Sequence, residues 1–144
     1  MSKVIALDEK DHLILAELRG DSRQSIRDIA KKTQIRPSTV HQRITVLRKY
    51  GIIEKFTVKL NSKSIGEDFT VFMLFNSEQN VEDKFIKNDH VKELCGITGE
   101  YDLIMKMKFR DVAEFNDFIL EFRKNKNIEK TLTMVVTATI KEEI

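Results

Sequence analysis

Side chains that can make specific polar contacts gather in residues 36–51, which read RPSTVHQRITVLRKYG. Val40, Ile44 and Leu47 recur at helical spacing, so this stretch is predicted to form one helix with an apolar stripe. At 100° per residue, the opposite stripe carries two hydroxyls, an amide and an ammonium group, from Ser38, Thr45, Gln42 and Lys49. Such groups can bond base edges in the major groove of duplex DNA. The alternative is an ordinary solvated helix face.

Each polar residue of this helix suggests its own contact with DNA. The amide of Gln42 matches the paired donor and acceptor of an adenine edge. Ser38 and Thr39 lie at the start of the helix, where recognition helices usually contact DNA, and His41 flanks them. Cationic side chains bond phosphates and position a protein without selecting a sequence, and the candidates are Arg23, Arg27, Arg43 and Lys49.

The composition is that of a globular chain of 144 residues, enough for one medium domain or two small ones. No apolar run approaches the ~20 residues of a membrane span, and no signal peptide opens the chain, so we expect a cytoplasmic protein. The one cysteine, Cys95, excludes an internal disulfide and is expected in the core. Three histidines without paired spacing predict no metal site.

The charge is divided unequally along the chain. Residues 1–60 contain 13 Lys and Arg against 7 Asp and Glu, a net charge of +6, whereas residues 61–144 contain 12 against 16, a net charge of −4. A basic half joined to an acidic half suggests that only the first half meets a polyanion.

The first half is predicted to hold three short helices. Asp8 and Ser25 each precede a helical pattern as N-caps, and Pro37 suits the first turn of the third helix. Gly51 ends that helix. Two helices joined by about four residues, the second with a polar face, are typical of a helix-turn-helix.

The rest of the chain is predicted to contain mainly strands. Residues 52–60, IIEKFTVKL, alternate as a strand, and the polar residues 61–68 are the plausible linker. The predicted domains are therefore 1–60 and 69–144. The second follows a βαββαβ pattern, with strands at 69–75, 91–98, 103–109 and 131–140, a short helix near 81–86 and a helix starting near 111.

The first strand of the second domain is apolar on both faces, although two helices can cover only one face of a four-stranded sheet. The missing cover is most simply a second copy of the chain, so we expect a homodimer. The alternative is that the first-half helices fold back over the sheet.

Three segments in order resemble the Lrp/AsnC, or feast/famine, transcription regulators: LDEKDHLILAEL, SIRDIAKKTQIRPSTVHQRITVLRKYGIIEKFTVKLN and GITGEYDLIMKM. The resemblance covers nearly the whole chain. It implies an α+β architecture, with an N-terminal winged helix-turn-helix domain and a C-terminal ferredoxin-like domain that dimerises. A dimer implies a roughly palindromic double-stranded DNA site, and tetramers or octamers are possible. The chain departs from the family pattern at Arg36, Val46 and Glu100.

The resemblance also implies an amino-acid effector, with no other cofactor. In the family the turn between the second and third strands lies at subunit contacts where an amino acid often binds. The matching candidates here are Thr98, Gly99, Glu100, Tyr101 and Asp102, with Thr133, Met134 and Val135 on the last strand as possible pocket lining. The alternative is a plain hairpin turn.

Two other functions are alternatives to a sequence-specific regulator. An architectural protein would coat DNA with little sequence choice. Some proteins similar to the family are haem-precursor decarboxylases, which need histidines or arginines around a large pocket. Because this chain has only His12, His41 and His90, and no Ser/His/Asp set or phosphate-binding glycine loop, we expect no enzyme.

Overall fold

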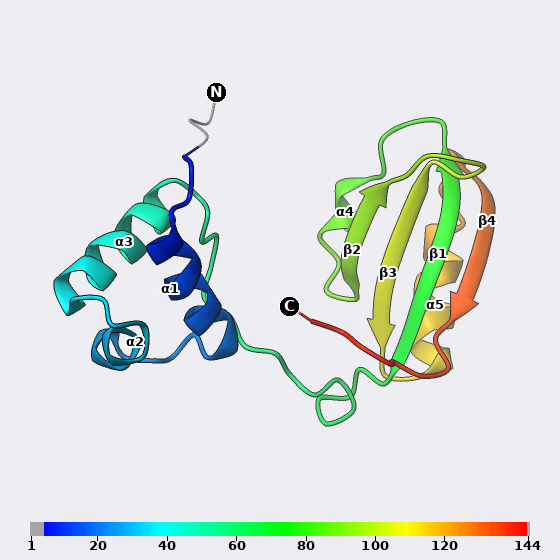
Figure 1. Cartoon of the computed structure of the whole chain (residues 1–144). Helices are drawn as coiled ribbons and strands as arrows, with labels where there is room; N and C mark the ends of the chain where they lie inside the picture. Colours follow the sequence, from blue (N-terminus) through cyan, green and yellow to red (C-terminus); the bar gives the residue numbers. More distant parts are fainter. Residues whose placement is uncertain (1–4, 144) are drawn as a thin grey trace. The chain divides into compact units, whose positions relative to one another are not determined.

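The computed structural model describes residues 5–143, which divide into two compact units between Lys59 and Leu60. Within these residues the first unit holds three helices, and the second holds a four-stranded sheet with two helices (Figure 1). Each unit has its own buried core. The predicted order, three helices followed by βαββαβ, is confirmed.

The helices of the first unit are α1 (Glu9–Gly20), α2 (Ile26–Thr33) and α3 (Pro37–Lys49). A reciprocal capping box between Asp8 and Asp11 starts α1, as the sequence suggested. These caps satisfy backbone N–H groups that a helix start otherwise leaves without partners.

The core of the first unit forms where the three helices meet. Ile14 of α1, Ile29 of α2 and Val40 of α3 are almost fully buried, at 0, 1 and 0% exposure. Gln34 ends α2 in a left-handed conformation, with φ of 59°, so that the chain turns sharply towards Pro37. Ile35, in this turn, is buried in the same core. The helix-turn-helix prediction is thus confirmed.

Residues 52–60 were wrongly predicted to form a strand. Gly51, with φ of 72°, ends α3, and the N–H groups of Ile52 and Ile53 donate to the Leu47 carbonyl at 2.9 and 3.1 Å. The described residues beyond this turn form no strand up to Phe69, because none of them pairs with another strand in the part of the chain that the structure describes. The alternating apolar side chains are exposed at Phe56, Val58 and Leu60.

The second unit is an antiparallel sheet in the order β2-β3-β1-β4, with both helices lying against one face (Figure 1). Its elements are β1 (Phe69–Ser77), α4 (Asp83–Ile86), β2 (Val91–Gly96), β3 (Leu103–Phe109), α5 (Val112–Phe122) and β4 (Ile128–Val135).

Alternate residues of β1 and β3 pack beneath the helices. Met73 pairs in register with Met105, and both side chains are fully buried. The rings of Phe75 and Phe85 contact Phe122 of α5 edge to face, with centroids 5.3 and 4.9 Å away. Met107, two residues further along β3, is buried in the same core.

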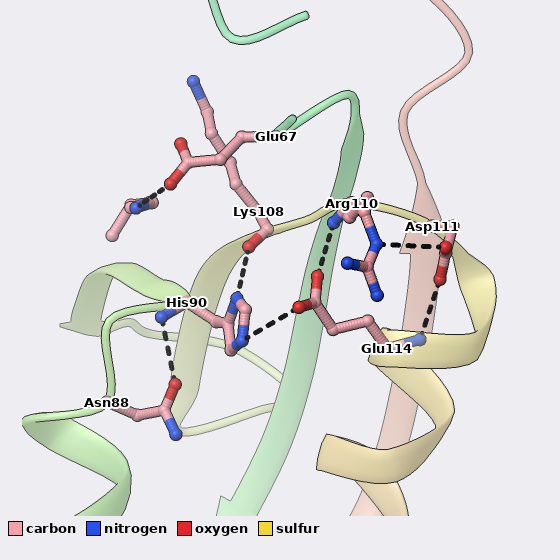
Figure 2. A network of polar contacts seen from close by, with 8 residues as sticks. Glu67, Asn88, His90, Lys108, Arg110, Asp111 and Glu114 are labelled. Atoms are coloured by element: carbon pink, nitrogen blue, oxygen red, sulfur yellow. Dashed lines mark hydrogen bonds and ion pairs between the residues drawn. The ribbon is translucent and has the colours of Figure 1, made fainter. Parts of the chain in front are cut away.

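The start of α5 is tied to the loop before β2 by a polar network around His90 (Figure 2). Nδ1 of His90 donates to the Lys108 carbonyl at 3.0 Å, and Nε2 lies 3.8 Å from the Glu114 carboxylate. The imidazole stacks on Phe109 with a centroid separation of 4.6 Å. Glu114 also accepts from the backbone N–H of Arg110 at 2.6 Å, so the network holds the β3–α5 turn in place.

The two helices of the second unit leave the other face of the sheet uncovered. Phe72 and Leu74 of β1 lie on it half-buried, opposite Met134 and Leu132 of β4, which are 41 and 43% exposed. Cys95 was wrongly expected in the core: it is exposed, because its pairing with Ile104 places it on this open face.

The last strand was predicted at 131–140 but spans Ile128–Val135. It starts early because a bulge at Lys130, with φ of 36°, lets the chain resume pairing with Asn76 and Ser77. It ends early because the register reaches the start of β1, where the Val136 N–H makes a last bond to the Thr70 carbonyl. Similarly, β2 stops at Gly96, two residues before its predicted end.

The segment after β4 crosses the open side of the sheet, opposite α5 (Figure 1). Its Glu142 carboxylate bonds the ammonium groups of Lys106 and Lys108, the second at 3.0 Å. The hydrogen bonds from these lysines lower the pKa of Glu142 to about 2, against a usual 4.5. Lys108 also donates to the hydroxyl of Ser62 at 2.9 Å, so this cluster holds both the linker and the C-terminal segment on β3.

We predict that Glu142→Gln lowers the free energy of unfolding at pH 7 and makes it less sensitive to acid. A carboxylate whose folded pKa lies below its unfolded value stabilises the fold fully above pH ~4.5, and that stability is lost as the pH falls towards ~2. The upper limit is about 3.5 kcal/mol, since one pKa unit corresponds to ~1.4 kcal/mol, and partial exposure reduces it.

Urea unfolding between pH 7 and 2.5 at constant protein concentration measures this effect. Glu143→Gln is the matched control, because Glu143 pairs with Lys141 in an exposed ion pair. A Glu142→Gln variant whose acid sensitivity equals that of the unchanged chain would contradict the stabilising role of the cluster.

Candidate functional site

Helix α3 exposes the polar stripe that the sequence predicted. Val40 and Leu47 on its opposite side are buried, at 0 and 2% exposure. The packing of these two residues fixes which side of α3 faces solvent. The four side chains of the polar stripe are all exposed: Ser38, Gln42, Thr45 and Lys49.

The start of α3 is open to an external partner. Arg36 is the N-cap residue but makes no capping hydrogen bond, so its side chain satisfies none of the first-turn N–H groups. Thr39, in this turn, is half-buried and His41 is exposed. The Thr45 hydroxyl donates to the His41 carbonyl at 2.9 Å, which leaves its oxygen able to accept a bond from a base.

Arg43 is placed differently from the other candidate cations. Its guanidinium points towards α1 and bonds the carboxylates of Asp8 and Asp11, the second at 3.1 Å. An arginine held by two carboxylates would have to leave them to bond a DNA phosphate, so its predicted phosphate contact stays a prediction. The sequence could not show this placement, because the partners are 32 and 35 residues away.

The remaining candidate cations stay accessible. Arg23, in the turn before α2, Arg27, in its first turn, and Lys49, at the end of α3, are exposed and make no ion pair among the described residues. Arg48, not among the predicted contacts, lies with its guanidinium carbon 5.5 Å from the centre of the Phe56 ring. These cations give the unit a surface suited to phosphates.

The candidate effector turn, residues 97–102, is held by residues that the sequence analysis missed. Asn76, at the end of β1, accepts from the Asp102 N–H at 2.9 Å and donates to the Glu100 carbonyl at 3.4 Å. Ile97 closes the turn by donating to the Asp102 carbonyl at 2.8 Å. Gly99, with φ of 122°, adopts a backbone conformation that favours glycine. Thr98 is exposed beside it.

Lys130 adds a charged contact to this turn. The bulge in β4 directs its ammonium group to the Glu100 carboxylate and places it 5.1 Å from the centre of the Tyr101 ring. The hydrogen bond lowers the pKa of Glu100 and raises that of Lys130. Both side chains are exposed, so a ligand could replace either partner.

The predicted lining residues of β4 do not join this turn within one chain. Phe75 of β1 pairs with Leu103, the first residue after the turn. Thr133 and Val135 pair with Met73 and Val71, which lie two and four positions along β1 from Phe75. That separation is ~7–13 Å at ~3.3 Å per residue. Thr133 also faces the core, and its hydroxyl is buried without a partner among the described residues. Only Met134 faces the open side.

The described residues contain no group of three or more His, Cys, Asp or Glu side chains suited to a metal ion. None of their helices combines the length and apolar character needed to cross a membrane.

A helix-turn-helix unit with an accessible polar third helix, joined to a ferredoxin-like βαββαβ unit, defines a DNA-binding transcription regulator. Two family models match the chain: a winged helix-turn-helix DNA-binding model at residues 7–54 and the Lrp/AsnC ligand binding domain at residues 70–144. The chain belongs to the Lrp/AsnC family, whose members are transcription regulators, not enzymes.

Known proteins resemble the chain over its full length. An uncharacterised HTH-type transcriptional regulator of Pyrococcus abyssi is 36% identical over 141 residues, covering 95% of this chain and 96% of the relative. The structure of Escherichia coli AsnC matches with a TM-score of 0.86 at 23% identity, covering 97 and 98% of the two chains. A Neisseria meningitidis transcriptional regulator, solved in complex with L-Met, matches with a TM-score of 0.85 at 21% identity, covering 96 and 94%.

Proposed function

We propose that this regulator binds a specific, roughly palindromic DNA site as a homodimer, through the polar stripe of α3. The observation that carries the proposal is the exposure of that stripe. A side chain such as Gln42 distinguishes bases, whereas Lys49 contacts only phosphate. Two copies would place two α3 helices on half-sites about one helical turn, ~10 bp, or a multiple apart.

The open face of the sheet supports a dimer. It carries half-buried and exposed apolar side chains over three adjacent strands, at Phe72, Leu74, Ile104, Leu132 and Met134. A soluble protein rarely leaves such a continuous apolar surface in water. A second copy related by a two-fold axis would bury the same surface on both chains.

The segment before the linker offers a second region for pairing. Phe56, Val58 and Leu60 alternate as in a strand, and their side chains are 45, 64 and 57% exposed. This segment lacks only a neighbouring strand with which to form hydrogen bonds. The same segment of a second chain could pair with it in antiparallel orientation. A larger assembly, such as a tetramer or octamer, would require further contacts between dimers.

The turn at residues 97–102 supports effector binding at subunit contacts. Its Glu100 and Asp102 carboxylates are exposed and could meet the amino group of an amino acid, while backbone N–H groups at Thr98 and Gly99 could hold its carboxylate. Tyr101 is half-buried at the same turn. Because Thr133, Met134 and Val135 lie away from this turn in one chain, they would line such a site only from a neighbouring subunit. The methionine bound to the Neisseria relative shows that this fold can hold an amino acid.

We predict different effects from two substitutions on α3. Gln42→Ala should reduce the ratio of affinities for a preferred and a scrambled duplex by about 5- to 150-fold, since a bidentate base contact contributes ~1–3 kcal/mol. Lys49→Ala should weaken both duplexes equally and lower the slope of log affinity against log salt by ~0.9.

Fluorescence anisotropy across a salt series, with the DNA upstream of the protein's own gene, measures both quantities. Arg19→Ala, an exposed cation of α1, is the control. Equal binding of the unchanged chain to both duplexes would favour an architectural protein that coats DNA. No effect of either substitution would exclude α3 as the recognition helix.

We predict that Leu132→Glu converts the dimer into monomers. The new carboxylate would be buried against the apolar face of the second copy, which costs several kcal/mol. Analytical ultracentrifugation at micromolar concentration measures the mass, and Leu120→Glu, on the exposed side of α5, is the control for charge. An unchanged dimer in the Leu132 variant would exclude this face as the interface.

We predict that calorimetry against the twenty amino acids identifies at least one that binds, and that Glu100→Ala or Asp102→Ala weakens it tenfold or more. The loss follows from removing the carboxylate that meets the ammonium group. Absence of both heat and any change in assembly for all twenty would contradict an amino-acid effector.

A further inference from the structure

Asp11 is the one buried polar or charged residue among the described residues, with 6% of its surface exposed. A buried carboxylate is costly unless charged or hydrogen-bonding partners surround it. Asp11 has two such partners: the backbone N–H of Asp8 at 3.1 Å and the guanidinium of Arg43 at 3.1 Å. One partner belongs to its own helix start, and the other belongs to the recognition helix.

Arg43 bridges two carboxylates whose positions are already fixed. The Asp8 side chain accepts from the Asp11 N–H at 2.9 Å, and the Asp11 side chain accepts from the Asp8 N–H. The other carboxylate oxygen of each residue faces α3 and accepts a hydrogen bond from the Arg43 guanidinium. Because the carboxylates are held by the capping box, the bridge joins the rigid start of α1 to α3.

The contact between Asp8 and Arg43 favours the charged form of both groups. The backbone hydrogen bond from Asp11 and the bond from Arg43 lower the pKa of Asp8, and the bonds to Asp8 and Asp11 raise the pKa of Arg43. Asp8 and Arg43 therefore keep their opposite charges near neutral pH.

Arg43 occupies a position on α3 that controls the direction of the polar stripe. It follows Gln42 directly, which places it ~100° around the helix axis from that side chain. Apolar contacts at Val40 and Leu47 decide which side of α3 faces the core. The hydrophobic force behind them is non-directional, so a directional contact is needed to set the finer rotation of the helix about its axis. A hydrogen-bonded guanidinium has a defined orientation and therefore resists rotation of the helix about its own axis.

We propose that Arg43, held by Asp8 and Asp11, is a positioning residue that sets the rotation of α3 and thereby aims Gln42 and Ser38 at the bases. The inference rests on the proposed sequence-specific binding of DNA by α3. The competing possibility is that Arg43 leaves the carboxylates and bonds a phosphate. The two possibilities predict opposite effects when the acidic partners are neutralised.

The first experiment neutralises the carboxylates in the full chain. Asp8→Asn and Asp11→Asn each remove a negative charge near polyanionic DNA, so charge alone would strengthen binding. A loss of alignment would weaken it instead. We expect affinity for a preferred duplex selected from a random pool to fall about tenfold, with a smaller change for a scrambled duplex. Asparagine keeps the N-cap acceptor at residue 8, so α1 remains capped.

Glu9→Gln is the matched control for these variants. Glu9 lies in the same turn of α1, is exposed and makes no ion pair among the described residues. Its neutralisation should leave affinity equal or slightly higher. The circular dichroism signal of the helices, recorded during thermal unfolding, shows whether every variant is folded at the temperature of the binding measurement.

The second experiment changes Arg43 itself and measures the salt slope. Arg43→Met keeps an unbranched side chain but removes the guanidinium. We expect the preference for the selected duplex to fall about tenfold with an unchanged salt slope, and Arg43→Lys to restore part of the preference. Loss of stability alone would alter the unfolding temperature but not the ratio of affinities of the folded protein.

Three results would overturn the inference. Tighter binding by Asp8→Asn and Asp11→Asn would show that their charge, not their alignment of Arg43, affects DNA. A salt slope lowered by ~0.9 in Arg43→Met, with equal weakening of both duplexes, would show a phosphate contact. Equal binding of both duplexes by the unchanged chain would overturn sequence-specific recognition itself, and the positioning role with it.

Discussion

The two helices of the C-terminal unit cover one face of its sheet, and much of the structure depends on that constraint. Val71, Met73 and Phe75 of β1 point towards α4 and α5 and are fully buried, whereas the neighbouring Phe72 and Leu74 point to the open face. A unit that makes both sides of β1 apolar requires more cover than its own two helices supply. This shortage is the strongest physical reason for a second copy.

The N-terminal unit is subject to a different constraint: it must hold α3 firmly while leaving one side of that helix accessible. Val40 and Leu47 anchor α3 in the core, and the polar stripe stays in solvent. Arg43 belongs neither to the apolar side of α3 that packs in the core nor to the exposed polar stripe. It turns towards the capping box of α1, so a cation beside the exposed polar stripe contributes to internal order. Charge near a nucleic-acid surface therefore does not by itself identify a phosphate contact.

The turn between β2 and β3 shows how irregular backbone concentrates polar groups. The bulge at Lys130 directs an ammonium group to Glu100, while Asn76 bonds the backbone on both sides of Tyr101. Three separate segments thus meet at one end of the strands. Their exposed charges are satisfied by each other in this chain, and they are accessible to a ligand or a neighbouring subunit.

The sequence by itself determined the features that depend on residues three or four positions apart. Helix boundaries, the caps at Asp8 and Ser25, the exposed stripe of α3 and the alternation of β1 and β3 all follow from such short-range patterns. The resemblance to a known family added the candidate effector turn, which periodicity alone does not provide.

Only the tertiary structure decided the features that need a partner far along the chain. Residues 52–60 have the alternation of a strand but no neighbouring strand, and β4 shifts because the length of β1 sets its pairing. Arg43 finds Asp11, and Lys130 finds Glu100, across 32 and 30 residues. Local sequence sets the conformation that a segment prefers, but the neighbours of a side chain exist only once the chain has folded.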